Sequence, residues 1–237
     1  LLQIGLAVTL TNGFPIFHNV YPGNLSDMQI MRDMIIRLKE QNIKAIIVDR
    51  GMLSTQSLKA LFSLSTQVIA GLKKNQRIVK EYLSKINREE IYTLKNRVGL
   101  INTSVFIMPF KTPKGTIIAV YNPDLEVVKK NINFEKGIES NDPYIGYSIL
   151  FHNTELSPDI VVRKYYEKDI VERAFKQLKG ALALRPIRVW LKEHVRGHVR
   201  VCYLAYAILS LLKYRVQKLN ISAPKALESL QEGYKIR

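Results

Sequence analysis

The chain has 237 residues, 47% of them hydrophobic, and its 36 Lys and Arg against 20 Asp and Glu give a formal net charge of +16. This composition excludes a disordered chain and fits a globular protein long enough to bury a core. The positive charge favours an anionic partner, nucleic acid first and an anionic membrane surface second. The single cysteine, Cys202, excludes a disulfide framework and a cysteine-based zinc site, and it suits a reducing compartment.

No apolar run approaches the roughly 18–20 residues needed to span a bilayer, so no membrane partner is predicted. The longest candidate, Val201–Leu212, has 12 residues and is interpreted as part of a buried helix. The chain begins inside the apolar run Leu1–Leu6 with no basic leader, which indicates no signal peptide. We interpret this beginning as a cut within a domain.

The first predicted elements are two antiparallel strands, Leu1–Leu10 and Phe14–Val20. Asn12-Gly13 between them supplies the positive φ angles of a tight hairpin turn. Pro22-Gly23-Asn24 then breaks the second strand. Ser26 or Asp27 can cap a helix that ends at Asn42.

A buried strand follows at Ala45–Val48, whose continuous apolar run is typical of a strand covered on both faces. A short helix from Ser54 to Phe62 and a strand at Gln67–Leu72 come next. Two strands followed by alternating helices and strands predict an α/β fold with a mixed sheet flanked by helices.

From Lys73 to about Tyr147, short apolar runs alternate with Gly and Pro, which predicts a β-rich insertion with strands at Thr103–Pro109 and Thr116–Tyr121. A strand at Tyr147–Phe151 leads back to the main domain. One long helix is then predicted over about 160–183, ended by Arg185-Pro186, and a last apolar helix over about 195–217.

Asp49 lies where the buried strand ends, at the edge of an open α/β sheet where ligands bind. A carboxylate there could hold a metal ion while its backbone stays rigid. Taken alone the signal is weak, because an Asp after a strand is more often a turn or helix-cap residue.

On the predicted long helix, Tyr165, Lys168, Glu172, Lys176 and Lys179 fall in one stripe at about 100° per residue. An ordinary surface helix explains this stripe if Lys168 and Lys176 brace Glu172 at i−4 and i+4. The functional interpretation is that the carboxylate binds a metal ion while neighbouring cations hold a phosphate backbone. We add the neighbouring Arg173 to these candidate DNA-binding residues.

The spacing of Tyr165, Lys168, Glu172 and Lys179 resembles the Tyr–Arg–Glu–Lys signature of insertion-sequence transposases with a DDE catalytic triad. Lys168 stands where that signature has Arg, which keeps the charge but loses bidentate geometry. The resemblance covers nearly the whole chain, because further stretches are similar to the same family. They are Pro22-Gly23-Asn24 with Asp27, Val48-Asp49-Arg50-Gly51, and Arg185 to Trp190.

The resemblance implies an RNase H-like fold in which two Asp and one Glu hold two divalent ions, Mg²⁺ or Mn²⁺. It makes Asp49 the second Asp and Glu172 the Glu, and it places the first Asp on a strand before Leu1. The predicted parts are then residues 1–75 and 148–217 of the catalytic domain, a β-rich insertion at 76–147 and a carboxyl-terminal tail at 218–237.

The resemblance also implies the reaction and the partners. Water attacks first to free a 3′-hydroxyl at the end of the mobile element, and that hydroxyl then attacks target DNA in the same site. Tyr165, Lys168 and Lys179 would hold the terminal phosphates. The expected partners are the transposon terminal repeats, target DNA and a second copy in a synaptic homodimer. The expected location is the cytoplasm, in association with the nucleoid.

Two other functions remain open from the sequence. An inactive, DNA-binding remnant of a transposase would keep the basic helix without a working triad. An RNase H-like nuclease or resolvase would share the metal chemistry but leaves the Tyr–Lys–Glu–Lys spacing unexplained.

Several other residues are given structural interpretations. His194 and His198 could share a metal ion on a helix, but a structural or DNA-facing role is favoured. Trp190 is expected to pack against the sheet rather than stack on a base, and Cys202 to lie in the core. Lys73-Lys74-Asn75 and Lys129-Lys130-Asn131 are interpreted as solvated turns.

Overall fold

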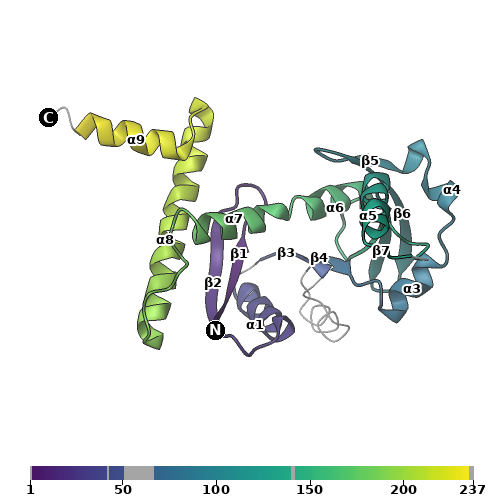
Figure 1. Cartoon of the computed structure of the whole chain (residues 1–237), viewed down its shortest axis with the longest axis horizontal. Helices are drawn as coiled ribbons and strands as arrows, with labels where there is room; N and C mark the ends of the chain where they lie inside the picture. The colour runs from purple at the N-terminus through teal and green to yellow at the C-terminus, as the bar shows by residue number, and fades with distance from the viewer. Residues whose placement is uncertain (1, 42, 51–66, 140–141, 235–237) are drawn as a thin grey trace. The chain divides into compact units, whose positions relative to one another are not determined.

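The computed structural model describes residues 2–41, 43–50, 67–139 and 142–234 (Figure 1). Its contacts divide the chain into two compact units. Leu1–Ser26 with Lys168–Arg237 form one, called here the hairpin unit, and Asp27–Glu167 form the other, called the sheet unit. Asp49 and Tyr165 belong to the sheet unit, whereas Glu172 belongs to the hairpin unit.

The sheet unit is built on six strands in the order β3-β4-β8-β7-β6-β5. Among the described strands β3 and β4 pair in parallel, and the other neighbours are antiparallel. The strands are β3 (Ala45–Val48), β4 (Gln67–Leu72), β5 (Arg97–Gly99), β6 (Ser104–Thr112), β7 (Gly115–Tyr121) and β8 (Tyr147–His152). The helices of the unit are α1 (Asp27–Lys39), α3 (Arg77–Leu83), α4 (Arg88–Ile91), η2 (Leu94–Asn96), α5 (Pro123–Glu135) and α6 (Pro158–Tyr166).

Helices cover both faces of this sheet, as the alternation of side chains along β7 shows. Ile117 and Ala119 pack in one buried cluster with Val79 and Leu83 of α3. Ile118 and Val120 pack in another with Val161, Val162 and Tyr165 of α6. The result is a mixed sheet flanked by helices, consistent with the RNase H-like fold, and the predicted fold class is confirmed.

The hairpin unit pairs β1 (Leu2–Val8) with β2 (Pro15–Pro22) in a separate two-stranded sheet. Gly13 has a φ of +68° in the turn, as the Asn-Gly pair predicts, and its carbonyl accepts a 2.9 Å hydrogen bond from the Tyr206 hydroxyl. The described helices of the unit are α7 (Asp169–Lys179), α8 (Lys192–Val216), η3 (Gln217–Leu219) and α9 (Ala223–Tyr234).

Two sequence predictions about helices are wrong. The long helix over about 160–183 is two helices, because α6 ends at Tyr166 and α7 begins at Asp169. Lys129-Lys130-Asn131 is not a turn but lies within α5, whose start carries the signals of an N-cap Asn122 and a following proline. The predicted helix from Ser54 to Phe62 and the predicted helix end at Asn42 lie outside the described residues.

The segment 76–147, expected to be rich in strands, holds β5, β6 and β7 but also α3, α4, η2 and α5. Its strands continue the main sheet through the pairing of β7 with β8. The range 218–237, expected to be a tail, contains α9. The four-part division of the chain remains a prediction.

The helix α8 with η3, Lys192–Leu219, is long and apolar enough to cross a membrane by length and composition alone. The sequence had predicted no apolar segment long enough to span a membrane. One face of α8 packs in the hairpin unit, where Val199, Cys202 and Tyr206 are buried in a cluster with Leu6. Core helices pass the same test of length and composition, so this helix is weak support for a membrane span.

Candidate functional site

Asp49 follows directly after β3, whose last residue Val48 is buried and pairs with Ala70 of the parallel strand β4. The carboxyl ends of two parallel strands meet at one edge of the sheet, which is where open α/β sheets bind ligands. Asp49 itself is partly exposed. The backbone that carries this carboxylate is therefore fixed by the sheet, while the side chain is open to solvent on one side.

Two donors converge on one oxygen of this carboxylate. The backbone N–H of Arg50 donates a 2.7 Å hydrogen bond to Oδ1 of Asp49, and the Tyr165 hydroxyl donates a 3.1 Å hydrogen bond to the same atom. Tyr165 is buried on α6, with 6% of its surface exposed. Burial raises the pKa of Tyr165, and the charge of Asp49 and its hydrogen bond raise it further. The hydroxyl therefore stays protonated and remains a donor at neutral pH.

Gly71 on β4 leaves the space in which this contact forms. A Cβ added at Gly71 would collide with the Tyr165 hydroxyl and would lie 2.9 Å from Cβ of Arg50. Real Cβ atoms essentially never come that close to another heavy atom, so a side chain here would force Arg50 or Tyr165 to move. The absence of a side chain at Gly71 lets Tyr165 reach Asp49.

Glu172 lies on α7, whose apolar face is buried through Ala174 and Leu178. The opposite face exposes Glu172, Arg173 and Lys176 along with Lys179. Lys179 extends over the ring of Phe175, with its Nζ 5.5 Å from the ring centroid. This division into an apolar and a charged face follows the predicted periodicity.

The ion pairs expected of an ordinary surface helix are not found at Glu172. Within the described part of the chain, its carboxylate makes no ion pair with Lys168 or Lys176. The arrangement is that of an exposed carboxylate with cations on the same helix face. A metal ligand and phosphate contacts could be presented in this way.

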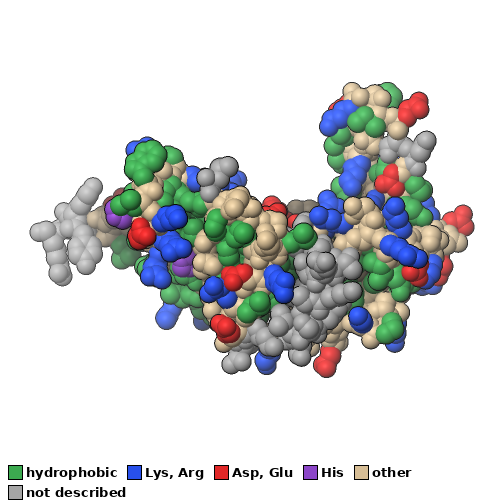
Figure 2. All heavy atoms as spheres, turned by 90° about the horizontal axis from the view of Figure 1, so that it is seen from below, with side chains coloured by type: hydrophobic (Ala, Val, Ile, Leu, Met, Phe, Trp, Pro, Cys, Tyr) green, Lys and Arg blue, Asp and Glu red, His purple; other side chains and the backbone are tan. Residues whose placement is uncertain are grey.

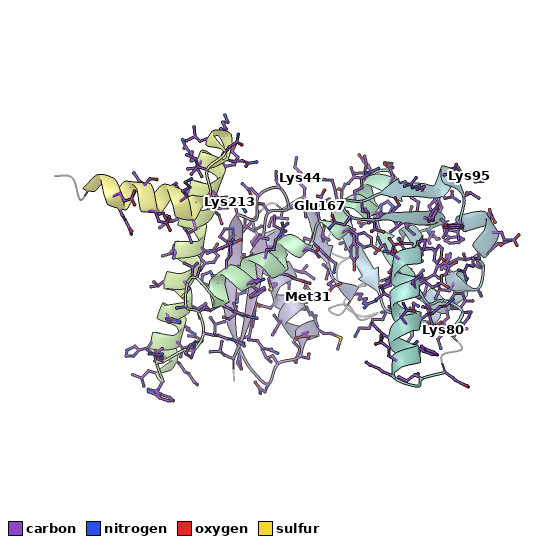
Figure 3. All side chains as sticks on the ribbon, turned by 45° about the horizontal axis from the view of Figure 1, so that its top comes forward. Met31, Lys44, Lys80, Lys95, Glu167 and Lys213 are labelled. Atoms are coloured by element: carbon purple, nitrogen blue, oxygen red, sulfur yellow. The ribbon has the colours of Figure 1, made fainter. Side chains whose placement is uncertain are left out.

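The predicted stripe from Tyr165 to Lys179 does not extend across both helices. The turn at Glu167 and Lys168 separates α6 from α7, so the angle of 100° per residue cannot be carried from Tyr165 to Glu172 (Figure 3). Tyr165 is buried beside Asp49, whereas Glu172 and the neighbouring cations of α7 are exposed. The prediction that Tyr165 shares one helix face with Glu172 and the three lysines is therefore wrong.

Oxygen donors of this kind suit Mg²⁺ or Mn²⁺, which carboxylates bind readily. Asp49 offers a partly exposed carboxylate that hydrogen bonds already orient, so its chemistry fits a metal ligand. Among the residues that the structure describes, no group of three or more His, Cys, Asp or Glu side chains is placed to hold an ion. His194 and His198 lie on α8, and their structural or DNA-facing role remains a prediction.

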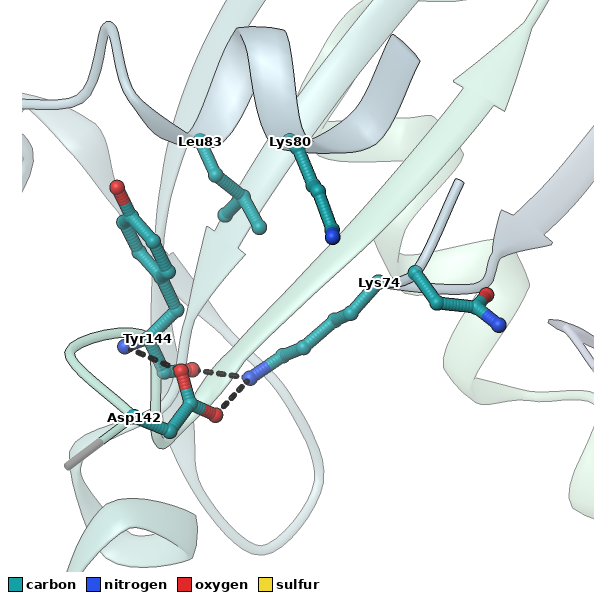
Figure 4. A pocket seen from close by; sticks show the side chains of 6 residues that line it. Lys74, Lys80, Leu83, Asp142 and Tyr144 are labelled. Atoms are coloured by element: carbon teal, nitrogen blue, oxygen red, sulfur yellow. Dashed lines mark hydrogen bonds and ion pairs between the residues drawn. The ribbon is translucent and has the colours of Figure 1, made fainter. Parts of the chain in front are cut away.

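A cluster of cations in the sheet unit was missed by the sequence analysis. A pocket of about 460 Å³ is lined by Lys74, Asn75, Lys80, Leu83, Asp142 and Tyr144. Figure 4 shows Lys74 bonded to Asp142 and to the Tyr144 carbonyl, with Lys80 extending from α3 into the same pocket.

Lys129 of α5 belongs to the same cluster. Burial lowers the pKa of Lys129, the charges of Lys74 and Arg50 lower it further, and Asp142 opposes them. Lys74 and Asn75 do lie in a turn, as predicted, but Lys129 does not. The Asn-Pro helix start before Lys129 was the signal that could have placed it on a helix.

The remaining candidates have mixed outcomes. Cys202 is buried, as expected, and its thiol donates a 3.3 Å hydrogen bond to the Leu182 carbonyl. Trp190 is 94% exposed, so the expectation that it packs against the sheet is wrong. Lys and Arg side chains are numerous on the face drawn in Figure 2, as the net charge of +16 requires.

Comparison with known protein families matches residues 2–208 to the family described as "Transposase DDE domain". Comparison with individual curated proteins gave no match. The matched range covers most of the chain and includes Asp49, Tyr165 and Glu172. The chain therefore belongs to the transposase DDE domain family.

Proposed function

We propose that this protein cleaves DNA at the ends of an insertion-sequence element and joins the freed 3′-hydroxyl to target DNA. The proposal rests on the position of the Asp49 carboxylate. It lies at the carboxyl end of a sheet strand, hydrogen bonded and partly exposed, in a chain of the transposase DDE domain family. Asp49 and Glu172 are the proposed metal ligands.

Cleavage of a phosphodiester requires a catalyst because the group is anionic and repels nucleophiles. Two divalent ions, when bound, activate the attacking oxygen and stabilise the leaving one. The contribution of the chain is to hold carboxylates in fixed positions. The hydrogen bonds from Arg50 and Tyr165 orient Asp49, and helix α7 presents Glu172 among cations.

The proposed DNA surface is the exposed face of α7 with Arg173, Lys176 and Lys179, together with the half-buried Lys168 in the turn before the helix. Cations that contact phosphates supply affinity that does not depend on base sequence. The terminal repeats and target DNA are the proposed partners, and a synaptic homodimer the proposed assembly. The proposed location is the cytoplasm, in association with the nucleoid.

Lys179→Ala is expected to weaken binding to element ends and to reduce the steepness of its salt dependence by about one unit, since each phosphate contact releases counterions. Binding measured over a series of salt concentrations checks this. The matched control is Lys95→Ala in η2, an exposed lysine of the sheet unit outside the proposed surface. An unchanged salt slope in Lys179→Ala, or an equal change in Lys95→Ala, would count against this surface.

The function itself is tested with the full gene product and a labelled duplex that ends in the element's terminal repeat. The expected result is a strand break that leaves a 3′-hydroxyl, requires Mg²⁺ or Mn²⁺ and is absent in EDTA. Binding without cleavage under all of these conditions would favour the inactive remnant. Cleavage without joining to target DNA would favour a nuclease.

A further inference from the structure

We infer that Tyr165 is a positioning residue for the metal ligand Asp49, and that Gly71 is required for it to act. This inference rests on the proposed function, in which Asp49 binds the metal. It gives the first residue of the Tyr–Lys–Glu–Lys spacing a task inside the protein instead of on the DNA.

The first support is the geometry of the hydroxyl. It donates a 3.1 Å hydrogen bond to Oδ1 of Asp49, the same atom that accepts the N–H of Arg50 at 2.7 Å. Two donors on one oxygen restrict rotation of the carboxylate. Groups that hydrogen bond to a metal ligand in this way orient it before the ion arrives, which strengthens metal binding.

The second support is the rigidity of the donor. Tyr165 is 6% exposed, and it packs with Val161 and Val162 of the same helix, which are fully buried against the sheet. A side chain held on this packed helix fixes the position of the hydroxyl. Its burial also favours a contact within the protein over one with a DNA phosphate.

The third support is Gly71. β4, the strand beside β3, carries a glycine at a point where a Cβ would collide with the Tyr165 hydroxyl. Glycine in the interior of a strand costs stability, and it often marks a close approach of other groups. Here that close approach is the contact between Tyr165 and Asp49.

The test compares Tyr165→Phe with Tyr166→Phe in the full protein. Tyr166 is the neighbouring residue and loses the same atom, but its hydroxyl interacts with Ser148. We expect Tyr165→Phe to weaken Mn²⁺ binding, measured by electron paramagnetic resonance of the free ion, by about tenfold or more. The Mg²⁺ concentration for half-maximal cleavage should rise in parallel. Binding to element ends in EDTA should stay at the wild-type level.

Two results would overturn the inference. Mn²⁺ affinity of Tyr165→Phe equal to that of Tyr166→Phe would show that the hydroxyl does not position Asp49. Weaker binding to DNA in EDTA, with Mn²⁺ affinity unchanged, would assign Tyr165 to a phosphate instead. Gly71→Ala provides a second variant, expected to give the same metal defect because its Cβ displaces the hydroxyl without removing it.

Asp49→Asn separates this inference from the proposed function. If Asp49→Asn keeps wild-type cleavage and Mn²⁺ binding, the assignment of Asp49 as a ligand fails and the positioning role fails with it. If Asp49→Asn is inactive while Tyr165→Phe behaves like Tyr166→Phe, only the positioning role fails.

Discussion

Replacing Glu172 with Gln is expected to reduce Mg²⁺-dependent cleavage of element ends by at least about a thousandfold, while DNA binding survives. The amide has the shape of the carboxylate but not its charge, and a divalent ion loses several kcal/mol of stabilisation with that ligand. A loss of about 4 kcal/mol corresponds to about three orders of magnitude in rate. Cleavage of a labelled element end, with binding measured in EDTA, separates the two effects.

The fold should tolerate this change because Glu172 is exposed and its carboxylate makes no ion pair in the described part of the chain. The matched control is Glu167→Gln, an exposed glutamate at the end of α6 that is not a proposed ligand. It should cleave at the wild-type rate. Wild-type cleavage by Glu172→Gln would contradict the assignment of Glu172 as a metal ligand. Equal losses of cleavage in both variants would mean that the loss of one negative charge matters, and not its position at Glu172.

Ile118→Ala should lower the free energy of unfolding of the protein by about 2–5 kcal/mol, the cost of an unfilled cavity in a packed core. Ile118 has no exposed surface and lies on β7, one of the two central strands of the sheet. It opposes Leu150 of β8 on one side and Pro109 of β6 on the other. Urea denaturation followed by circular dichroism measures the change.

The control for this prediction is Ile101→Ala, the same substitution at a side chain that is 93% exposed. Its free energy of unfolding should stay within about 0.5 kcal/mol of wild type. A loss below about 1 kcal/mol in Ile118→Ala would mean that β7 does not form the centre of the core.

Much of the fold could be predicted because it rests on local patterns. The Asn12-Gly13 turn, the apolar run before Asp49 and the strand at Gln67–Leu72 all correspond to elements of the structure. In each case the neighbouring residues alone determine the backbone conformation. The fold class followed from the order of these elements along the chain.

The break between α6 and α7 could not be predicted from periodicity. The segment 165–168 carries no Gly or Pro, and the residues on either side favour a helix. The chain nevertheless turns there, and tertiary packing decides the outcome: Tyr165 is buried with the sheet, while Ala174 and Leu178 are buried with Leu6. Long-range contacts of this kind leave no local pattern.

The candidate site was predicted in part. Asp49 was placed correctly at the end of a strand, but the prediction that this strand is buried on both faces is wrong: β3 lies at the edge of the described sheet, and Val48 is its only buried residue. Its contact with Tyr165 spans 116 residues of sequence, and no periodicity could pair the two. Trp190 was predicted wrongly, since its large aromatic side chain was expected to pack against the sheet and is almost wholly exposed. Whether a single residue is buried depends on residues that are distant in sequence, and the sequence alone does not show which of them pack around it.

The division of the chain has a consequence for the order in which the protein folds on the ribosome. The sheet unit is one continuous stretch, Asp27–Glu167, whereas the hairpin unit needs residues from both ends of the chain. All residues of the sheet unit are synthesised before Lys168. The contact between Asp49 and Tyr165 lies within this stretch, so it can form before the hairpin unit is complete.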